Sequence, residues 1–217
     1  MKRLHHQLRI TEIFYSLQGE STTTGLPTVF IRLTGCPLRC QYCDTAYAFS
    51  GGILQDIEDV LNHVASFDCL YVCVTGGEPL AQPGCLELLK QLCDSGYRVS
   101  LETSGARDIS KVDKRVMIVM DLKTPDSKEH EKNQMSNLDY LKPDDQIKFV
   151  LCSRADYEWA CTLIKTFKLN ERAHLLFSPS WNQLNATSLA EWIIEDHLPV
   201  RFQIQIHKIL WNDAPGH

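Results

Sequence analysis

Residues 28–45 read TVFIRLTGCPLRCQYCDT and contain three cysteines, Cys36, Cys40 and Cys43, in the spacing Cys-x3-Cys-x2-Cys. Three thiolates with this spacing cannot lie along one helix or strand and point at one centre, so they need a loop that curls around a metal group. Thiolate is a soft ligand, which favours zinc or an iron–sulfur cluster. No fourth cysteine stands at a partner spacing nearby. A structural site needs four ligands, whereas three ligands leave one iron of a four-iron cluster open for chemistry.

The residues around this loop predict a strand before it and alternating helices and strands after it. Residues 28–34 are rich in β-branched and aromatic side chains and lie between a proline and a glycine, which predicts a strand. The cysteine loop therefore follows the C-terminal end of a strand, where α/β proteins place their active sites. Further strands are expected at residues 70–75, 97–103, 115–122, 145–151, 173–177 and 201–210, and helices at residues 55–67, 84–95, 155–167 and 189–196.

Two further stretches of the chain are expected to lack regular helices or long strands. Residues 8–19 predict only a short extended or turn-like lead-in, and the polar residues 124–137 predict a loop or lid. The whole alternation amounts to about six βα units and a last strand, which predicts a parallel sheet with right-handed crossovers. A chain of 217 residues is short for an eight-unit barrel, which takes about 250. We therefore expect the α/β class and an incomplete (β/α)6 TIM-like barrel, with an open doubly wound sheet as the alternative.

Composition narrows the class of protein. Hydrophobic residues make up 44% of the chain and charged residues 23%, as in ordinary globular proteins. The net charge of −5 and the lack of a basic stripe argue against a nucleic-acid partner. No apolar run approaches the roughly 20 residues of a membrane helix, and the N-terminus lacks the apolar stretch of a signal peptide.

The cysteine count points to a reducing compartment. Nine cysteines without a secretory signal predict reduced thiols and metal ligands in a cytoplasmic protein. Six of them lie outside the loop and are expected to be buried thiols, with a second cluster as the alternative: Cys69, Cys73, Cys85, Cys93, Cys152 and Cys161.

A second motif, Gly-Gly-Glu-Pro at residues 76–79, follows the strand expected at residues 70–75. Two glycines let the backbone approach a ligand closely, and Glu78 is expected to place a carboxylate near the strand tip. Backbone carbonyls beside a carboxylate suit the ammonium group of an amino acid. On its own the motif could be a plain strand-to-helix turn, but its place after a cysteine triad favours a binding site.

The cysteine spacing and the Gly-Gly-Glu-Pro segment together resemble the radical S-adenosylmethionine (SAM) superfamily. That resemblance implies one [4Fe-4S] cluster on Cys36, Cys40 and Cys43, with S-adenosyl-L-methionine chelating the open iron. The catalytic agent would then be a 5′-deoxyadenosyl radical rather than a side chain. An incomplete barrel of six βα units is a common core in this superfamily. The residues implied to bind S-adenosylmethionine are Tyr42, Cys43, Asp44, Gly76, Gly77, Glu78, Glu102, Ser104, Asp121 and Lys123.

Five shorter segments together resemble the 7-carboxy-7-deazaguanine synthase family: residues 17–20 (LQGE), 30–33 (FIRL), 43–45 (CDT), 102–105 (ETSG) and 205–211 (QIHKILW). The resemblance implies a radical SAM lyase that converts 6-carboxy-5,6,7,8-tetrahydropterin to 7-carboxy-7-deazaguanine with loss of ammonia, on the way to the queuosine precursor. It also implies Mg2+, a flavodoxin- or ferredoxin-type reductant and a homodimer. The chain departs from the family at Ser21, where glycine is frequent, and at Ser104, where asparagine is common.

The same resemblance implies a substrate site. Its members are Leu17, Gln18, Gly19, Glu20, Arg32, Thr75, Gln205 and His207, with Thr45 as the Mg2+ ligand. Gln18 and Glu20 suit the guanine-like edge of a pterin, and the guanidinium of Arg32 suits its carboxylate. The hydroxyl of Thr45 is a hard oxygen ligand of the kind that Mg2+ takes. Without the family resemblance, Thr45 would be interpreted as a turn or cap residue. A lone histidine on a strand, such as His207, is likewise more often structural.

On this interpretation the chain is a single domain over residues 1–217. Residues 1–27 would form a substrate-binding N-terminal extension, residues 28–200 the partial barrel core, and residues 201–217 a C-terminal strand and tail that close the pocket. Two alternatives stay open. A glycyl-radical-enzyme activase would share the cysteine triad but would not need Arg32, and a non-catalytic metal-binding module would need only the thiols.

Overall fold

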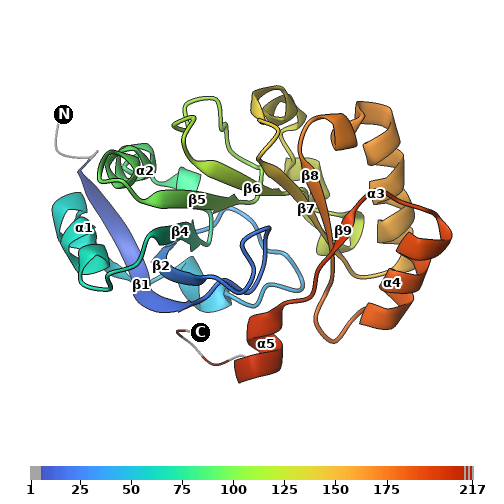
Figure 1. Ribbon diagram of the computed structural model, residues 1–217, viewed down its shortest axis with the longest axis horizontal. Helices are drawn as coiled ribbons and strands as arrows, with labels where there is room; N and C mark the ends of the chain where they lie inside the picture. Colours follow the sequence, from blue (N-terminus) through green and yellow to red (C-terminus); the bar gives the residue numbers. More distant parts are fainter. Residues whose placement is uncertain (1–5, 213, 215, 217) are drawn as a thin grey trace.

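The computed structural model describes residues 6–212, 214 and 216 of the 217-residue chain. Within those residues the frame is a nine-stranded sheet in the order β3-β1-β2-β4-β5-β6-β7-β8-β9 (Figure 1). The strands are β1 (Gln7–Leu17), β2 (Pro27–Leu33), β3 (Ile53–Asp56), β4 (Tyr71–Gly76), β5 (Arg98–Thr103), β6 (Met117–Asp121), β7 (Gln146–Leu151), β8 (His174–Pro179) and β9 (Arg201–Phe202).

The strand order identifies the architecture as a partial barrel. β2 pairs in parallel with β4, and from β4 to β9 each strand pairs in parallel with the next one along the chain, so the order of the parallel strands never reverses. A doubly wound sheet would need such a reversal, so the incomplete TIM-like barrel is confirmed and the doubly wound alternative is excluded. In this arrangement the carboxyl ends of all the parallel strands meet on one side, where barrels of this kind place their sites.

Helices cover the outside of this sheet, and each of the four helices expected from the sequence is present with slightly different bounds. The α-helices are α1 (Ile57–Ala65), α2 (Cys85–Asp94), α3 (Arg154–Phe167), α4 (Ala186–Glu195) and α5 (Ile206–Trp211). In Figure 1, α1 and α2 lie beside the β4–β5 part of the sheet, and α3 and α4 lie beside the β7–β9 part. Only α1 to α4 lie in crossovers between parallel strands. Of the about six βα units expected, four therefore contain an α-helix in the described chain.

The connections from β5 to β6 and from β6 to β7 are loops with short 3-10 turns. Residues 124–137, expected as a loop or lid, contain the turns Pro125–Ser127 and His130–Lys132 and begin the turn Met135–Tyr140. Their anchor is Asn137, which is 1% exposed and donates hydrogen bonds to the carbonyls of Gly105 (3.0 Å) and Arg107 (2.8 Å). The buried Asn137 side chain satisfies loop backbone groups that hydrogen bonds within a crossover helix would otherwise satisfy.

The N-terminal prediction was right about extended backbone and wrong about its extent. Residues 7–17 form β1, a full strand of 11 residues that pairs antiparallel with both β2 and β3, rather than a short lead-in. Its apolar spacing looks irregular in the sequence because the register shifts between Ile10 and Glu12. A bulge of this kind interrupts the period-two alternation that identifies a strand. The N-terminal region is therefore part of the sheet rather than an extension outside it.

The C-terminal prediction was also wrong. The strand expected at residues 201–210 is reduced to Arg201–Phe202, and the chain then forms α5. The N–H of Gln203 still donates to the carbonyl of Phe177 (2.9 Å), but the N–H of Ile206 donates to the carbonyl of Gly19 (3.2 Å). The tail leaves the sheet because its next backbone partner is the β1–β2 loop. The alternating sequence of residues 201–210 does not reveal this contact.

Aromatic rings join the outer helices to the sheet at the β7–β8 end. Phe177 on β8 lies edge-on to Phe149 on β7 at 5.5 Å and to Tyr157 on α3 at 5.8 Å between ring centroids. All three rings are almost completely buried, and the hydroxyl of Tyr157 donates to Asp196 (2.7 Å) at the end of α4. Burial of each such side chain stabilises the fold by about 1.5–3 kcal/mol.

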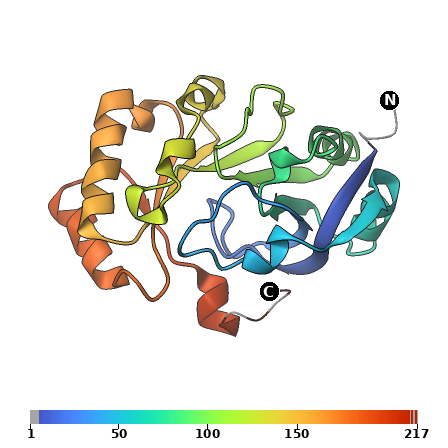
Figure 2. The ribbon, with the colours of Figure 1, turned by 180° about the vertical axis from the view of Figure 1, so that it is seen from behind.

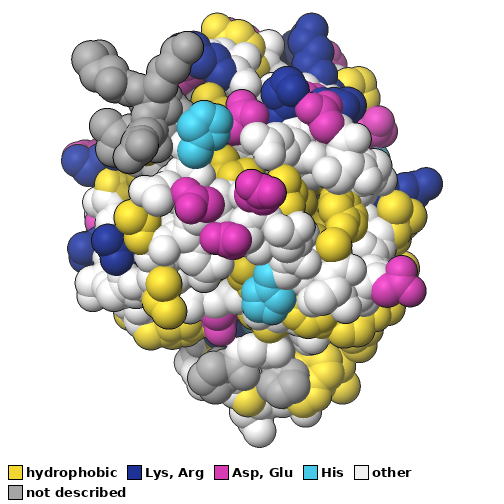
Figure 3. Space-filling model, turned by 90° about the vertical axis from the view of Figure 1, so that its left-hand side faces the viewer, with side chains coloured by type: hydrophobic (Ala, Val, Ile, Leu, Met, Phe, Trp, Pro, Cys, Tyr) yellow, Lys and Arg dark blue, Asp and Glu magenta, His cyan; other side chains and the backbone are white. Residues whose placement is uncertain are grey.

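The surface differs from the core in the expected way. On the side where α1 and α2 lie, Asp and Glu side chains occupy the middle of the face and Lys and Arg lie toward its edges (Figure 3). This face therefore offers no basic stripe. Among the helices of the described chain, none has the length and the apolar character to cross a membrane.

The aromatic contact predicts a large loss of stability for Phe177→Ala. Removal of the ring leaves a cavity between β7, β8 and α3, so the free energy of unfolding should fall by about 3–5 kcal/mol. The matched control is Phe202→Ala, because Phe202 is the register partner of Phe177 but is 36% exposed; it should lose less than about 1 kcal/mol. Urea unfolding measures both values, and equal losses would contradict the assignment of Phe177 to the core.

Candidate active site

A cavity of about 280 Å3 opens at the carboxyl ends of the parallel strands. It brings together segments that are far apart in the sequence: the β1–β2 loop, the cysteine loop, the ends of β4 to β7 and the C-terminal residues. The residues from the sequence prediction that line it are Leu17, Gln18, Gly19, Glu20, Arg32, Cys36, Cys40, Tyr42, Cys43, Asp44, Thr45, Thr75, Gly76, Gly77, Glu102, Ser104, Asp121, Lys123, Gln205 and His207. One cavity therefore holds every predicted site residue except Glu78.

The cysteine loop is held against the glycine turn that follows β4. The N–H of Glu78 donates to the carbonyl of Gly35 (2.8 Å), and the N–H of Gly77 donates to the carbonyl of Leu33 (3.1 Å). A Cβ atom on Gly77 would come within 2.3 Å of the Gly35 oxygen and 2.8 Å of the Cys36 Cβ. Only glycine permits this approach, so the second motif supports the first by direct backbone contact.

The three thiols of the loop are half-buried and free of disulfides. Burial raises the pKa of the Cys36 thiol, and it raises the pKa of Cys40 to about 11, because a buried thiolate is poorly solvated and the neighbouring thiols add like charge. A bound cation is what stabilises thiolates in such a place. Among the described residues no three His, Cys, Asp or Glu side chains converge as ligands of a single ion. The donor set fits an iron–sulfur cluster, which is held by separate cysteine thiolates.

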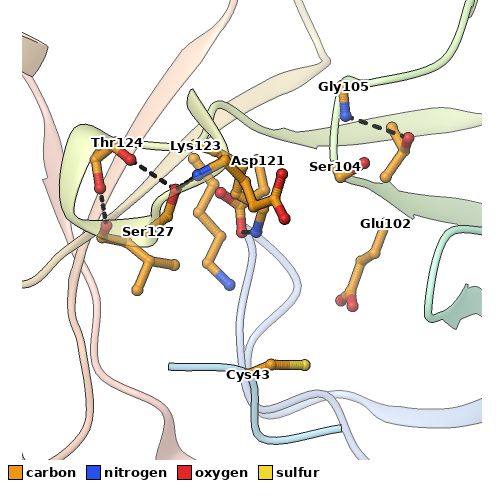
Figure 4. A network of polar contacts seen from close by, with 12 residues as sticks. Cys43, Glu102, Ser104, Gly105, Asp121, Lys123, Thr124 and Ser127 are labelled. Atoms are coloured by element: carbon orange, nitrogen blue, oxygen red, sulfur yellow. Dashed lines mark hydrogen bonds and ion pairs between the residues drawn. The ribbon is translucent and has the colours of Figure 1, made fainter. Parts of the chain in front are cut away.

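The wall beside the thiols contains two buried polar atoms without a partner in the described chain. Asp121, at the end of β6, pairs its Oδ2 atom with the Lys123 ammonium (2.8 Å), but its Oδ1 atom has no hydrogen-bond partner, and neither does the hydroxyl of Tyr42. Figure 4 shows Asp121, Lys123 and Glu102 around the space next to Cys43. Buried polar groups normally have partners, so these atoms fit a polar ligand such as S-adenosylmethionine.

The structure corrects the expected position of the Glu78 carboxylate. Its side chain is 0% exposed and does not line the cavity. The carboxylate accepts hydrogen bonds from the N–H of Leu80 (3.0 Å), the hydroxyl of Thr103 (2.9 Å) and both the N–H (2.8 Å) and the hydroxyl (2.5 Å) of Ser104. Because the glycine turn presents its backbone toward the cysteine loop, the Glu78 side chain points the other way and ties this turn to the end of β5.

The predicted substrate residues form the opposite wall. The side-chain oxygen of Gln18 accepts from the N–H of Glu20 (3.2 Å), and its amide donates to Glu102 (3.4 Å). The hydroxyl of Thr75 also donates to Glu102 (2.9 Å). Glu102 was predicted as a contact of S-adenosylmethionine, and the structure places it beside two predicted substrate residues.

Arg32 is fixed in orientation before any ligand arrives. Its Nε atom donates to Glu12 (2.6 Å), and its guanidinium lies 5.7 Å and 5.8 Å from the ring centroids of Phe14 and Tyr47. The hydroxyl of Tyr47 donates to the same Glu12 oxygen (2.7 Å). With Nε in use, the terminal N–H groups of Arg32 are left for an anionic ligand, the arrangement that favours a carboxylate.

A C-terminal arm, defined here as residues 203–212, contributes four residues to the wall of the cavity: Gln205, His207, Lys208 and Asn212. Figures 1 and 2 both show α5 on the side where the β1–β2 loop and the cysteine loop lie. The amide of Gln205 donates to Glu20 (2.5 Å), and the Lys208 ammonium pairs with Asp44 (2.8 Å). His207 lies against Gly19, where a Cβ atom would come within 2.1 Å of the His207 ring. Gln205 and His207 thus reach the cavity from a helix and its cap, not from a strand.

Two charged lining residues were missed by the sequence analysis. Lys148 on β7 is 9% exposed and forms an ion pair with Glu20, and Lys208 on α5 is 6% exposed and pairs with Asp44. The signal for Lys148 was present, because it interrupts the otherwise apolar run of residues 147–151 (IKFVL). A strand buried on both faces is normally apolar throughout. For Lys208 no sequence signal existed, since α5 itself was not expected.

The other six cysteines lie outside the cavity. Cys73 and Cys85 are buried, as expected, whereas Cys69, Cys93, Cys152 and Cys161 are half-buried. All six are free thiols.

Comparison with known proteins identifies the class of this site. The profile of the radical SAM superfamily matches residues 30–168. The 7-carboxy-7-deazaguanine synthase of Chlorobaculum tepidum is 44% identical over 213 residues, covering 96% of this chain and 97% of the relative. The enzyme of the same name from Koribacter versatilis is 40% identical, with 94% and 97% covered. The crystal structure of QueE from Escherichia coli has a TM-score of 0.77 at 24% identity, covering 92% and 94%, and so shares the fold.

The partial barrel and its three-cysteine loop are those of the radical SAM superfamily. Within that superfamily, the full-length relatives show that this chain belongs to the 7-carboxy-7-deazaguanine synthase family.

The thiol positions predict that Cys40→Ala abolishes cluster binding. Loss of one of three ligands leaves too few thiolates for a four-iron cluster, so reconstituted protein should lose its brown colour and its iron. Cys93→Ala is the matched control, because Cys93 is also half-buried but does not line the cavity. Iron and sulfide content per folded chain is the measurement. Full iron content in Cys40→Ala would show that another residue holds the cluster.

The glycine contact makes an independent prediction about the loop. Gly77→Ala should displace the cysteine loop, because the added methyl group would overlap the Gly35 oxygen and Cys36, and iron content per folded chain should fall severalfold. Gly96→Ala is the control; an added Cβ there meets nothing within 4 Å, although its φ of +88° costs some stability. Equal iron content in the two variants would argue against the packing of the loop on this turn.

Proposed function

We propose that this protein is a radical SAM carbon–nitrogen lyase that converts 6-carboxy-5,6,7,8-tetrahydropterin to 7-carboxy-7-deazaguanine with loss of ammonia, in the pathway to the queuosine precursor. The observation that carries this proposal is one cavity lined on one side by the three-cysteine loop and on the other by Gln18, Glu20 and Arg32. The cluster side generates reactivity, and the opposite side has the hydrogen-bonding groups of a pterin site.

On the cluster side, Cys36, Cys40 and Cys43 would hold one [4Fe-4S] cluster, and the turn at Gly76 and Gly77 would hold S-adenosylmethionine. When bound, these two cofactors supply the 5′-deoxyadenosyl radical that takes hydrogen from the substrate. The chain itself contributes binding and orientation. The free Oδ1 atom of Asp121 and the free hydroxyl of Tyr42 are supporting features, because each needs a polar partner.

On the substrate side, each residue has one suitable role. The terminal N–H groups of Arg32 suit the substrate carboxylate, since a fixed guanidinium binds carboxylates in a planar, two-point fashion. Gln18 and Glu20, both almost completely buried, suit the edge of the pyrimidine ring. The C-terminal arm covers these groups and would exclude water when the substrate is bound.

Three further elements belong to the proposal. Thr45 would bind Mg2+ through its hydroxyl, which lies 3.8 Å from the Cys43 sulfur at the cavity wall. A flavodoxin- or ferredoxin-type protein would supply the electron, as the family resemblance implies. The protein would work as a homodimer and in the cytoplasm, as the family resemblance and the free thiols suggest.

Two other functions suit the observations less well. A glycyl-radical-enzyme activase would need the cysteine loop but would have no use for a pre-oriented Arg32. A non-catalytic metal-binding module would need neither the cavity nor the buried charges that line it.

Anaerobic turnover tests the proposed function directly. The reconstituted protein, with a chemical reductant, Mg2+ and S-adenosylmethionine, should convert 6-carboxy-5,6,7,8-tetrahydropterin to the deazaguanine product and release ammonia. Mass spectrometry detects the product, and 5′-deoxyadenosine formation reports cofactor cleavage separately. Cofactor cleavage without product would show that the superfamily assignment holds but the substrate is different.

Arg32 provides a substrate-specific prediction. Arg32→Ala should keep its cluster but raise KM by about tenfold to a hundredfold, because a charge-assisted hydrogen bond contributes about 1.5–3 kcal/mol. Arg98→Ala is the control, since Arg98 lies over the exposed face of Tyr71, away from the cavity. Loss of the cluster in Arg32→Ala would show a structural role for this residue instead.

A further inference from the structure

Lys148 is a buried charge that the proposed reaction has not yet used. It lies on β7 between Ile147 and Phe149, both fully buried, and its side chain reaches the cavity. Its ammonium forms an ion pair with the Oε2 atom of Glu20, and the two side chains are each 11% exposed. A buried ion pair is not in itself a source of stability, since desolvation offsets most of the attraction. Its position in the substrate wall therefore calls for another explanation.

The charges around this pair come from three other elements, α5, β6 and β5. Glu20, in the β1–β2 loop, faces Lys148 on β7 and His207 on α5. Lys148 in turn faces Glu20, Asp121 at the end of β6 and Glu102 on β5. Burial alone would raise the pKa of Glu20, but the Lys148 ammonium outweighs it and holds this pKa below its ordinary value of 4.5. Glu20 is thus ionised at neutral pH and can only accept hydrogen bonds.

Both oxygens of Glu20 have partners in this structure, and the partners differ in kind. Lys148 holds Oε2 from within the sheet, whereas Gln205 donates to Oε1 (2.5 Å) from the C-terminal arm. The amide of Gln205 occupies the position that an N–H donor of a ligand would take. Displacement of this amide by a ligand N–H would free Oε1, while Lys148 would still fix the charge and the direction of the carboxylate.

We propose that Lys148 is a positioning residue for the substrate: it keeps Glu20 an oriented carboxylate and thereby selects a ring edge that presents two adjacent N–H donors. This inference rests on the proposed function. A 2-amino-4-oxo pyrimidine edge has a ring N–H beside an exocyclic amine, and an ionised carboxylate matches both. A 2,4-dioxo edge has a carbonyl in place of the amine. A carboxylate repels this carbonyl, whereas a protonated carboxyl donates a hydrogen bond to it.

The consequence for Lys148→Met has a definite sign. The variant keeps the apolar stem but removes the ammonium, so burial becomes the largest influence on Glu20, ahead of His207 and Gln205, and the ionisation of Glu20 shifts to higher pH. At neutral pH part of the protein then carries a protonated Glu20 that mismatches the substrate. Substrate binding should weaken, should recover as the pH rises, and should become more tolerant of the dioxo analogue.

The experiment compares Lys148→Met, Lys148→Arg and the control Lys90→Met, whose ammonium pairs with Asp94 on the surface. In Lys148→Met, KM at neutral pH should rise about tenfold with kcat changed less than about threefold, and the acid limb of kcat/KM should move up by about one pH unit or more. Lys148→Arg retains the charge and should restore most of the wild-type profile. The discrimination against 6-carboxytetrahydrolumazine, the 2,4-dioxo analogue, should fall about tenfold in Lys148→Met alone.

Calorimetry supplies a readout that does not depend on turnover. Substrate titrations in two buffers with different ionisation enthalpies give the number of protons released on binding. Compared with the wild type, Lys148→Met should release additional protons at neutral pH, because Glu20 must ionise before it accepts the substrate. If this variant does not fold, the double variant Lys148→Met/Glu20→Gln removes both charges and takes its place; it should lose the acid limb and the discrimination together.

The possible failures are distinguishable. Wild-type protein that cleaves S-adenosylmethionine but forms no deazaguanine overturns the proposed function. Active wild-type protein with an unchanged KM, acid limb and discrimination in Lys148→Met overturns the role of Lys148. A fall in kcat with unchanged KM overturns it as well, because that result would place Lys148 in the chemical step rather than in substrate positioning.

Discussion

The close approach of the β4 turn to the cysteine loop is the contact on which the rest of the site depends. Gly77 comes so near to Gly35 and Cys36 that no side chain fits between them, and Glu78 anchors this turn to Ser104 at the end of β5. Three strand ends are thus connected through backbone and one buried carboxylate. The thiols can therefore face the cavity in a fixed orientation, which a loop of this length could not maintain alone.

Both walls of the cavity contain buried charges in pairs. Arg32 with Glu12, Lys123 with Asp121 and Lys148 with Glu20 each place an ion where desolvation is costly. Such pairs contribute little net stability, but they fix the direction and the ionisation state of groups that a ligand must meet. Pre-organisation of this kind avoids reorienting polar groups when the substrate binds. The apolar contacts between the sheet and the helices, such as those of Phe177, supply the stability that offsets this desolvation cost.

Much of the architecture could be predicted because its signals are local. The strand before the cysteines, the helices α2 and α3 and the carboxyl-end position of the site follow from periodicity and from breakers such as Gly96. The main failures lie at the two ends of the chain, and the short strand β3 was not expected either. The bulge in β1 obscured a strand whose burial alternates only over residues 7–10, and the C-terminal arm alternates like a strand although it folds as a helix over Gly19.

The sequence by itself determined the chemistry: the thiol spacing, the glycines beside it and the polar residues of the LQGE segment are properties of residue type and order. Only the tertiary structure decided which of these groups meet. It turned the Glu78 carboxylate away from the cavity and brought Lys148 to Glu20 across 128 positions of the chain. The physical reason is that local preference acts through near neighbours along the chain, whereas the pairing of buried charges depends on which strands the sheet places side by side.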